Sequence, residues 1–370
     1  MSEALAPRDE RRSRPTASLP LRDELRGIEP YGAPRADVPV QLNVNENPYP
    51  PSEALAADAA EAVAEAVRTA NRYPDREASA LRADLAGYLG HGLDASRVWA
   101  ANGSNEIMLQ ILQAFGGPGR TAVSFAPTYS MYPEYARNTA TAWVVGRRTA
   151  EFTIDPAHAL DVVAEHSPSV VLLASPNNPT GTALPLELVT KLHDATPQAL
   201  IVVDEAYAEF RRPGTPSALS LLDALPRLAV TRTMSKAFAA AGVRLGYVAG
   251  SVELVDALRV VRLPYHLSAI TQAVARVALR YADELLGRVA ELRDTRDELV
   301  AWLRTRGLSA SDSDANFVLF GTFTDRHAVW SGLLERGVLV RETGPDGWLR
   351  VSVGTPEDMR AFREALLEVI

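Results

Sequence analysis

The feature that most constrains the fold is an alternation of short apolar runs with segments of helical periodicity, which begins near residue 98. After the first run, apolar residues between 107 and 115 recur at the spacing of one helical face. Six runs predict strands: Val98–Ala101, Thr121–Phe125, Thr141–Val145, Val170–Ala174, Leu200–Val203 and Leu228–Val230. Several are apolar at every position, as strands covered on both faces must be. The alternation predicts an α/β fold with a large, mostly parallel sheet flanked by helices.

The pattern changes after about Leu263. A long helical stretch extends to Arg306, and a final helix is expected from Pro356. The strand candidates between them are Asn316–Phe320, Val338–Arg341 and Trp348–Val353. We therefore expect a large domain over residues 52–263 and a smaller α+β domain over residues 264–370.

The N-terminal part has a different character. Residues 1–20 are rich in Arg, Ser, Pro and Glu and are expected to form a disordered tail. Residues 21–51 contain repeated prolines, which forbid long helices and favour an extended arm. Helices are predicted over Ser52–Arg68 and Ser79–Leu89, with a turn at Asn71–Asp75 between them.

Composition narrows the class of protein. The chain of 370 residues is 47% hydrophobic and 23% charged, as expected for a soluble globular protein. A net charge of -8 argues against a general nucleic-acid binder. The absence of cysteine excludes disulfides and thiolate chemistry, and the six histidines show no metal-ligand spacing. No apolar run approaches the ~18–20 residues of a membrane span, so a cytoplasmic location is expected.

Polar clusters follow three neighbouring strand candidates: Ser175–Gly181, Asp204–Tyr207 and Thr231–Lys236. Ligands of open parallel sheets bind outside the carboxyl ends of the strands. Each cluster alone has an ordinary explanation, namely a turn, a helix cap or a solvated lysine. Their convergence on one edge of the sheet predicts a binding site.

A fourth loop predicts an anion site. Asn102–Asn105 lies between a strand and a helix, where small residues present free backbone N–H groups at the positive end of the helix dipole. An ordinary helix cap is the alternative. Arg244, eight residues after Lys236, adds a fixed positive charge. A lysine, an aspartate and a phosphate cradle together indicate one cofactor.

These motifs resemble those of the fold-type-I pyridoxal-phosphate aminotransferases, from about Leu21 to the C-terminus. The motifs are Leu42–Pro48, Arg72–Asp75, Pro127–Tyr129, Ser175–Gly181, Asp204–Tyr207 and Ser235–Phe238. Within that superfamily the chain is similar to the histidinol-phosphate aminotransferases. That narrower resemblance rests on Asn45–Pro48, Pro30–Tyr31, the turn at Tyr73 and the closing run Gly347–Gly354.

The resemblance implies roles for the residues at the strand ends. Lys236 would carry pyridoxal 5'-phosphate as a Schiff base and would move the substrate's Cα proton. Asp204 would pair with the pyridine nitrogen, and Asn178 and Tyr207 would bind the phenolic oxygen. Tyr129 would stack on the ring.

The resemblance also implies sites for two anions. The cofactor phosphate would be bound by Gly103, Ser104, Asn105, Thr233, Ser235 and Arg244. Tyr73 would reach this phosphate from a partner subunit, which implies a homodimer with shared active sites. The substrate would contact Arg350, Arg341, Asn178 and Tyr31, since arginine binds carboxylate or phosphate with two parallel hydrogen bonds.

The expected reaction is transamination between histidinol phosphate and 2-oxoglutarate, giving imidazole acetol phosphate and glutamate, in histidine biosynthesis. Three alternatives remain open from the sequence. An aromatic amino-acid aminotransferase shares nearly all of these residues, and a phosphoamino-acid decarboxylase could use the same scaffold. A regulatory domain that binds the cofactor only as a ligand is the alternative outside enzymes.

Overall fold

The computed structural model describes residues 19–370, which form two compact units divided after Gly32. The described part of the first unit contains a short 3₁₀ helix, η3 (Asp23–Leu25). The second unit is Ala33–Ile370 and contains all the sheets described below. Apart from its last two residues, the predicted disordered tail lies outside the described residues.

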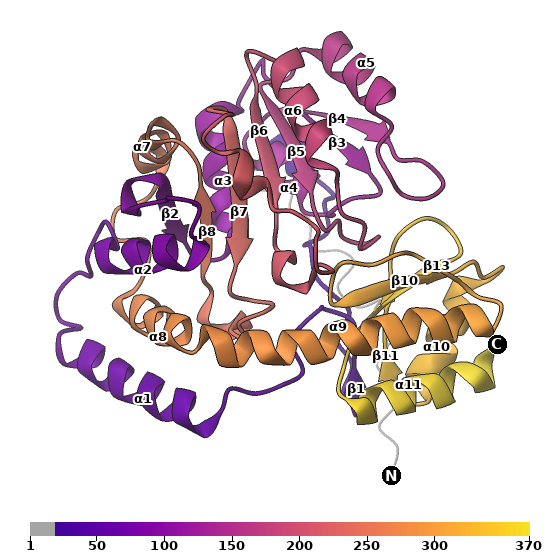
Figure 1. Cartoon of the computed structure of the whole chain (residues 1–370). Coiled ribbons are helices and arrows are strands. Elements are labelled where there is room, and N and C mark those ends of the chain that lie inside the picture. Colours follow the sequence, from indigo (N-terminus) through magenta and orange to yellow (C-terminus); the bar gives the residue numbers. More distant parts are fainter. Residues whose placement is uncertain (1–18) are drawn as a thin grey trace. The chain divides into compact units, whose positions relative to one another are not determined.

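A seven-stranded sheet forms the centre of the second unit, in the order β2-β8-β7-β6-β5-β3-β4 (Figure 1). Its strands are β2 (Val98–Ala101), β3 (Thr121–Ala126), β4 (Ala142–Arg147), β5 (Val170–Ala174), β6 (Leu200–Asp204), β7 (Leu228–Thr233) and β8 (Gly246–Ala249). The pairs from β4 to β7 are all parallel, whereas β8 runs antiparallel to both β7 and β2. The predicted mostly parallel sheet is confirmed, and β8 is the strand that the apolar pattern did not predict.

Successive residues of the central strands point into two different hydrophobic clusters. On β6, Leu200 and Val202 belong to one cluster and Ile201 and Val203 to the other, as the period of two in a strand requires. The first cluster packs under α3 (Ser104–Phe115), α4 (Tyr132–Asn138) and α7 (Val252–Val261). The second packs under α2 (Ser79–Leu89), α5 (Pro156–His166) and α6 (Leu186–Ala195). By this alternation Asp204 shares the face of α4.

The long helical stretch predicted after Leu263 is two helices, α8 (Ala269–Arg280) and α9 (Ala282–Thr305). Tyr281 separates them because its backbone leaves the helical region, at φ -100° and ψ 18°. The Tyr281 hydroxyl donates to Asp58 on α1 (Glu53–Arg68), so the break is fixed by packing between helices. No helix among residues 19–370 is long and apolar enough to cross a bilayer.

A separate antiparallel sheet follows α9, in the order β12-β13-β10-β9. Its strands are β9 (Ser309–Ala310), β10 (Phe317–Gly321), β12 (Arg341–Glu342) and β13 (Trp348–Ser352), with α10 (Arg326–Glu335) and α11 (Pro356–Val369) in the same part of the chain. The arm contributes β1 (Val40–Gln41), which pairs in parallel with β11 (Val338–Leu339). The predicted α+β arrangement is confirmed. The domain boundaries at residues 51 and 263 remain predictions.

Candidate active site

Lys236 lies in the turn that follows β7. Its Nζ donates a hydrogen bond of 2.9 Å to the carbonyl oxygen of Val44 and lies 6.0 Å from the centre of the Tyr207 ring. Burial, together with the nearby charges of Arg350 and Arg244, lowers the pKa of this amine from 10.5 to about 8, although Glu46 opposes the shift. A usable fraction of the amine is therefore neutral near pH 7–8, as a nucleophilic lysine requires.

Asp204 ends β6 and is held by three donors. Its Oδ2 accepts from the Tyr132 hydroxyl at 3.0 Å, and its Oδ1 accepts from the Thr231 hydroxyl at 3.1 Å and from the amide of Ala206 at 3.2 Å. Burial raises the pKa of Asp204 to about 6, and these hydrogen bonds oppose the rise. The carboxylate is therefore fixed in position and mostly ionised at neutral pH, so it can pair with a buried positive charge.

The start of α3 forms a concave group of donors. Gly103 precedes the helix with φ 83°, and a Cβ there would lie 2.6 Å from Nη2 of Arg244. A Cβ on Gly246 would lie 2.1 Å from the amide nitrogen of Ser104. Only glycine permits these two close approaches. They bring β8, the Arg244 side chain and the N-terminus of α3 together.

Hydroxyl groups from the turn after β7 complete this group. The Thr233 hydroxyl accepts from the amide of Ser235 at 3.1 Å, and Nη1 of Arg244 donates to the Ser235 hydroxyl at 3.2 Å. The side chain of Asn105 lies elsewhere, since its Oδ1 accepts from Tyr135 at 2.8 Å and from Tyr129 at 3.4 Å. The structure therefore brings the predicted phosphate residues together, with Asn105 turned toward two tyrosines.

Arg350 and Arg341 lie opposite each other on the paired strands β13 and β12, so their side chains leave the same face of the sheet. Arg350 is buried; it donates to Oδ1 of Asn178 and, at 2.7 Å, to the carbonyl of Asn43. Nη1 of Arg341 is buried with no hydrogen-bond partner among the described residues. Like charges placed directly opposite are unfavourable unless an anion compensates them.

The bond from Arg350 also orients Asn178. Because Oδ1 of Asn178 accepts from Arg350, its NH₂ group is left to donate to another oxygen. Asn177 next to it anchors two loops: its Oδ1 accepts from the Thr128 hydroxyl at 3.0 Å, and its Nδ2 donates to the carbonyl of Pro127 at 3.0 Å. This contact holds the loop that carries Tyr129, whose ring meets Tyr132 edge to face at 5.6 Å.

Three consecutive arm residues contact the site. The carbonyls of Asn43 and Val44 accept from Arg350 and Lys236, and Nδ2 of Asn45 donates to the Tyr207 hydroxyl at 3.0 Å. Asn45 lies within the motif Leu42–Pro48, but nothing in the pattern distinguished it from its neighbours.

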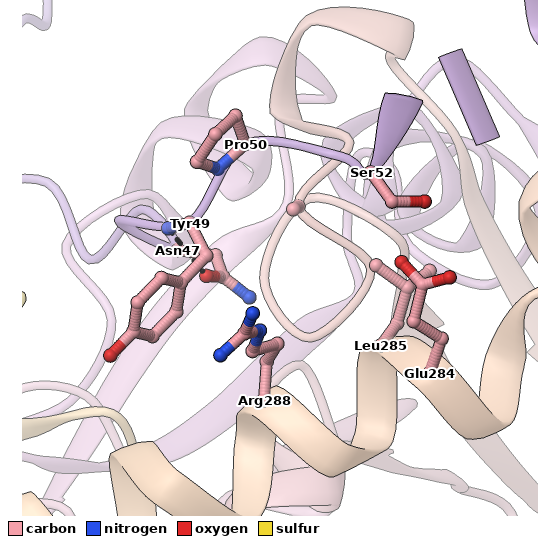
Figure 2. A pocket seen from close by; sticks show the side chains of 8 residues that line it. Asn47, Tyr49, Pro50, Ser52, Glu284, Leu285 and Arg288 are labelled. Carbon is pink, nitrogen blue, oxygen red and sulfur yellow. Dashed lines mark hydrogen bonds between the residues drawn. The ribbon is translucent and has the colours of Figure 1, made fainter. Parts of the chain in front are cut away.

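The arm is also packed against α9. Figure 2 shows a small pocket where the side chains of Asn47 and Tyr49 on the arm face Arg288 on α9. The Arg288 guanidinium lies 5.1 Å from the Tyr49 ring centre, and Asn47 donates to the carbonyl of Ala237 at 3.4 Å. The pocket therefore marks where the arm is held against α9 and beside the turn of Lys236.

One predicted residue, Tyr73, lies apart from this group. Tyr73 is 79% exposed and stacks on Tyr265, with ring centres 4.3 Å apart. Tyr31 belongs to the first compact unit, which is described by itself, so its role remains a prediction. Thr231, which holds Asp204, lies in the predicted cluster Thr231–Lys236 but was given no role. Tyr132 was not predicted, because a tyrosine on a helix is an ordinary core residue.

Comparison with known proteins identifies the family of this chain. Residues 37–366 match the family model for aminotransferases of class I and II, and the chain belongs to that family. A histidinol-phosphate aminotransferase of Thermobifida fusca is 65% identical over 349 residues, covering 94% of this chain and 95% of the relative. Histidinol-phosphate aminotransferase 3 of Burkholderia lata is 60% identical and covers 96% of both chains. Within the family the chain therefore belongs with the histidinol-phosphate aminotransferases.

Solved structures show the same fold. The histidinol-phosphate aminotransferase of Sinorhizobium meliloti, in complex with pyridoxal-5'-phosphate, has a TM-score of 0.81 at 26% identity, over 90% of each chain. An aspartate aminotransferase of Thermus thermophilus has a TM-score of 0.81 at 24% identity, over 95% of this chain and 99% of the other. The second similarity concerns the fold alone. The predicted fold class and family are confirmed.

Proposed function

We propose that this chain transfers an amino group between histidinol phosphate and 2-oxoglutarate, with pyridoxal 5'-phosphate as cofactor, in histidine biosynthesis. The observation that carries the proposal is that Arg350 lies near Lys236, whose pKa it helps to lower, and that Arg341 lies opposite Arg350 on the paired strand. The names of the relatives, at 65% and 60% identity, support the same substrate. The products would be imidazole acetol phosphate and glutamate.

The residues present fit the cofactor's two ends. When bound, the cofactor supplies an aldehyde for the lysine and a ring that draws electrons from the substrate's Cα. Asp204 would hold the protonated pyridine nitrogen, because its carboxylate is buried and fixed by three donors. Asn178 and Tyr207 would donate to the phenolic oxygen, and Tyr129 would lie against the ring.

The phosphate end would be bound at the N-terminus of α3. The amides of Ser104 and Asn105 lie in the first turn of that helix, where backbone N–H groups lack intrahelical acceptors. Gly103, Thr233, Ser235 and Arg244 complete the donor set. This combination of hydroxyl, amide and guanidinium groups suits a dianion.

Lys236 is the proton carrier in this proposal. Its amine would take the proton from the substrate's Cα and return it at the cofactor's carbon. The lowered pKa, at about 8, keeps the amine close to balance between its neutral and charged forms. The Val44 carbonyl would hold the amine whenever it is not bound to the cofactor.

Arg341 and Arg350 would bind the substrate's phosphate, with Tyr31 and Asn178 as the other predicted contacts. The decisive comparison is kcat/KM for histidinol phosphate against phenylalanine, each with 2-oxoglutarate. We expect histidinol phosphate to be preferred, and Arg341→Met to lower its kcat/KM far more than that of phenylalanine. A preference for phenylalanine would identify an aromatic amino-acid aminotransferase instead.

We further propose a cytoplasmic homodimer with shared active sites. Large apolar side chains are exposed at the end of α1 and the turn after it, and from the end of α7 to the start of α8: Val67, Tyr73, Val260, Leu263, Tyr265 and Ile270. Exposed apolar groups of this kind are typical of interaction surfaces. A second copy of the chain would cover them and would receive Tyr73 at its cofactor phosphate.

The identity of the catalytic lysine can be tested directly. Lys236→Ala is expected to lose the visible absorbance of the lysine-bound cofactor and to lose transamination. A variant that keeps normal turnover would remove the basis of the proposal. Release of carbon dioxide from a phosphoamino acid, without amino transfer, would point to the decarboxylase reaction.

A further inference from the structure

Asn45, on the arm, donates a hydrogen bond to the hydroxyl of Tyr207. Which of the two groups is the donor matters for the function of Tyr207. We propose that Asn45 is a positioning residue that makes Tyr207 point its proton toward the cofactor's phenolic oxygen. The inference rests on the proposed function, because it concerns how the cofactor is held. It gives the arm a role in how the cofactor is held.

The direction of the bond follows from a main-chain group. The amide N–H of Asn45 can only donate, and it donates to the Ser352 hydroxyl at 2.9 Å. That hydroxyl must then use its own proton elsewhere, and Oδ1 of Asn45 lies 3.0 Å away as its acceptor. The side-chain amide is thereby fixed with its NH₂ group toward Tyr207, at 3.0 Å. Tyr207 accepts this bond and must donate its proton in another direction.

The residues in this series of hydrogen bonds are held rigidly. Asn45 is 2% exposed, and Ser352 is buried beside it on β13. Nδ2 of Asn316 donates to the carbonyl of Asn45 at 3.2 Å, which holds the arm from a second side. The Tyr207 ring meets Phe317 edge to face at 5.0 Å, so the ring is held as well. Since neither partner can turn away, the hydrogen-bond direction is built into the fold.

Asn45 also has an unusual backbone, with φ 57°. Asparagine, aspartate and glycine adopt this left-handed conformation most readily. The position therefore accepts two informative replacements without backbone strain. Asn45→Gly removes the donor without adding charge, and Asn45→Asp keeps the shape but replaces the donor by an acceptor.

The consequence is measurable on the cofactor-loaded protein. A proton donated to the phenolic oxygen draws electron density from the cofactor and lowers the proton affinity of the nitrogen that joins it to Lys236. A hydroxyl that accepts a hydrogen bond is also a stronger donor, because hydrogen bonds in a chain polarise one another. Losing the bond from Asn45 should therefore raise the pH midpoint of the visible absorbance band.

The experiment is a pH titration of that band in wild type, Asn45→Gly and Asn45→Asp, each also in a Tyr207→Phe background. We expect Asn45→Gly to raise the midpoint by about 0.5 pH unit, on the order of one weakened neutral hydrogen bond. Asn45→Asp should raise it further, because Tyr207 would then donate to the carboxylate. In the Tyr207→Phe background Asn45→Gly should cause no further rise.

A midpoint that is unchanged in Asn45→Gly, or that moves equally with and without the Tyr207 hydroxyl, would overturn the inference. If Asn45→Gly does not fold, Ser352→Ala serves instead, since it frees the amide to turn and should raise the midpoint in the same direction. An unchanged midpoint in Ser352→Ala would also contradict the proposal. Absence of the band in the wild type would overturn the proposed function itself, which keeps the two failures distinct.

Discussion

At the scale of single residues, the site depends on two buried groups, Asp204 and Lys236, whose charges are set by burial and by their neighbours. Asp204 keeps its negative charge because donors from α4, β7 and its own loop oppose the desolvation. Lys236 loses part of its positive charge for the opposite reason, since burial and two arginines disfavour it. Both shifts bring the pKa of the group closer to neutral pH, and for Lys236 this is what proton transfer requires.

Tyr132→Phe should raise the pKa of Asp204 above its value of about 6, because the variant removes a donor to the carboxylate. A hydrogen bond to a charged group contributes about 1.5–3 kcal/mol, so the rise should be about one to two pH units. The ionised form binds the cofactor, so cofactor affinity should fall as pH drops through this pKa, and at a higher pH in the variant. Equilibrium binding of the cofactor to apo-protein across pH measures it.

The same helix offers a matched control for this prediction. Tyr135 lies one turn after Tyr132 on α4, and its hydroxyl contacts Asn105 at 2.8 Å instead of Asp204. Tyr135→Phe should therefore leave the pH midpoint of cofactor binding unchanged. Equal midpoints in Tyr132→Phe and the wild type would show that the Tyr132 hydroxyl does not support the charge on Asp204.

The lowered pKa of Lys236 predicts how the rate of cofactor incorporation changes with pH. Only the neutral amine attacks an aldehyde, so the rate of cofactor incorporation into apo-protein should rise with pH and level off above about pH 8. Arg350→Met removes a positive charge that lowers this pKa, so the midpoint should move upward, though not to 10.5 because burial remains. Stopped-flow absorbance measures the rate, with a free lysine derivative as control for the cofactor's own titration. A midpoint that stays at 8 in Arg350→Met would contradict this assignment.

Part of this site was predictable at the residue scale and part was not. Lys236, Asp204 and Asn178 were predicted because each follows an apolar run, and strand ends meet at one edge of a parallel sheet. Asn45 was not, because its partner Ser352 is 307 residues away and both are small polar residues without a distinctive spacing. Tyr132 was missed for a similar reason, since its hydroxyl meets a carboxylate 72 residues further along the chain.

At the scale of elements, the ends of β6 and β7 bear different polar groups on their two faces. Asp204 and Thr231 lie on the face of α4, whereas the neighbouring Glu205 and Arg232 turn to the other side, where Arg232 donates to Glu205 at 2.7 Å. Glu205 is 1% exposed; burial acts to raise its pKa, but the charges of Arg232 and Arg211 hold the pKa below the usual range. This ion pair lies directly behind the strand ends that carry the site.

Arg232→Met should destabilise the protein strongly, because it leaves the Glu205 carboxylate buried with only its remaining donors. Removing one partner of a buried ion pair costs about 3–5 kcal/mol. Denaturant unfolding of the apo-protein measures the loss. The double variant Glu205→Gln/Arg232→Met should lose less than the sum of the single changes, since the two groups are coupled. A loss below about 1 kcal/mol in Arg232→Met would show that the pair is not structural.

The elements themselves were largely predictable, with one informative exception. Buried parallel strands are continuous apolar runs and were recognised as such, but β8 is four residues long and begins with Gly246. Its pattern resembles the end of a loop. It is a strand because it fills the space between β2 and β7 and because Gly246 allows contact with the N-terminus of α3. Neither reason is visible without the tertiary structure.

At the scale of the whole molecule, the proposed dimer has a consequence that no single chain could show. If Tyr73 acts in the partner's site, Lys236→Ala in one subunit and Tyr73→Ala in the other damage the same site of a mixed dimer. One site then carries both defects, and the other has an intact lysine and receives an intact Tyr73. Mixing two variants of low activity should therefore restore activity.

Equal amounts of the two variants, exchanged under mild denaturant and returned to buffer, should recover about a quarter of the wild-type rate. This follows because half of the dimers in a random mixture are mixed and each has one intact site. The control is the double variant Lys236→Ala/Tyr73→Ala mixed with wild type, whose mixed dimers should contain no intact site. If Tyr73 instead served its own subunit, that control would keep one intact site per mixed dimer, and the first mixture would stay near the mean of its two parents. The exposed stacking of Tyr73 on Tyr265 favours the shared arrangement, since a ring that is 79% exposed in one chain has most of its surface left for a second.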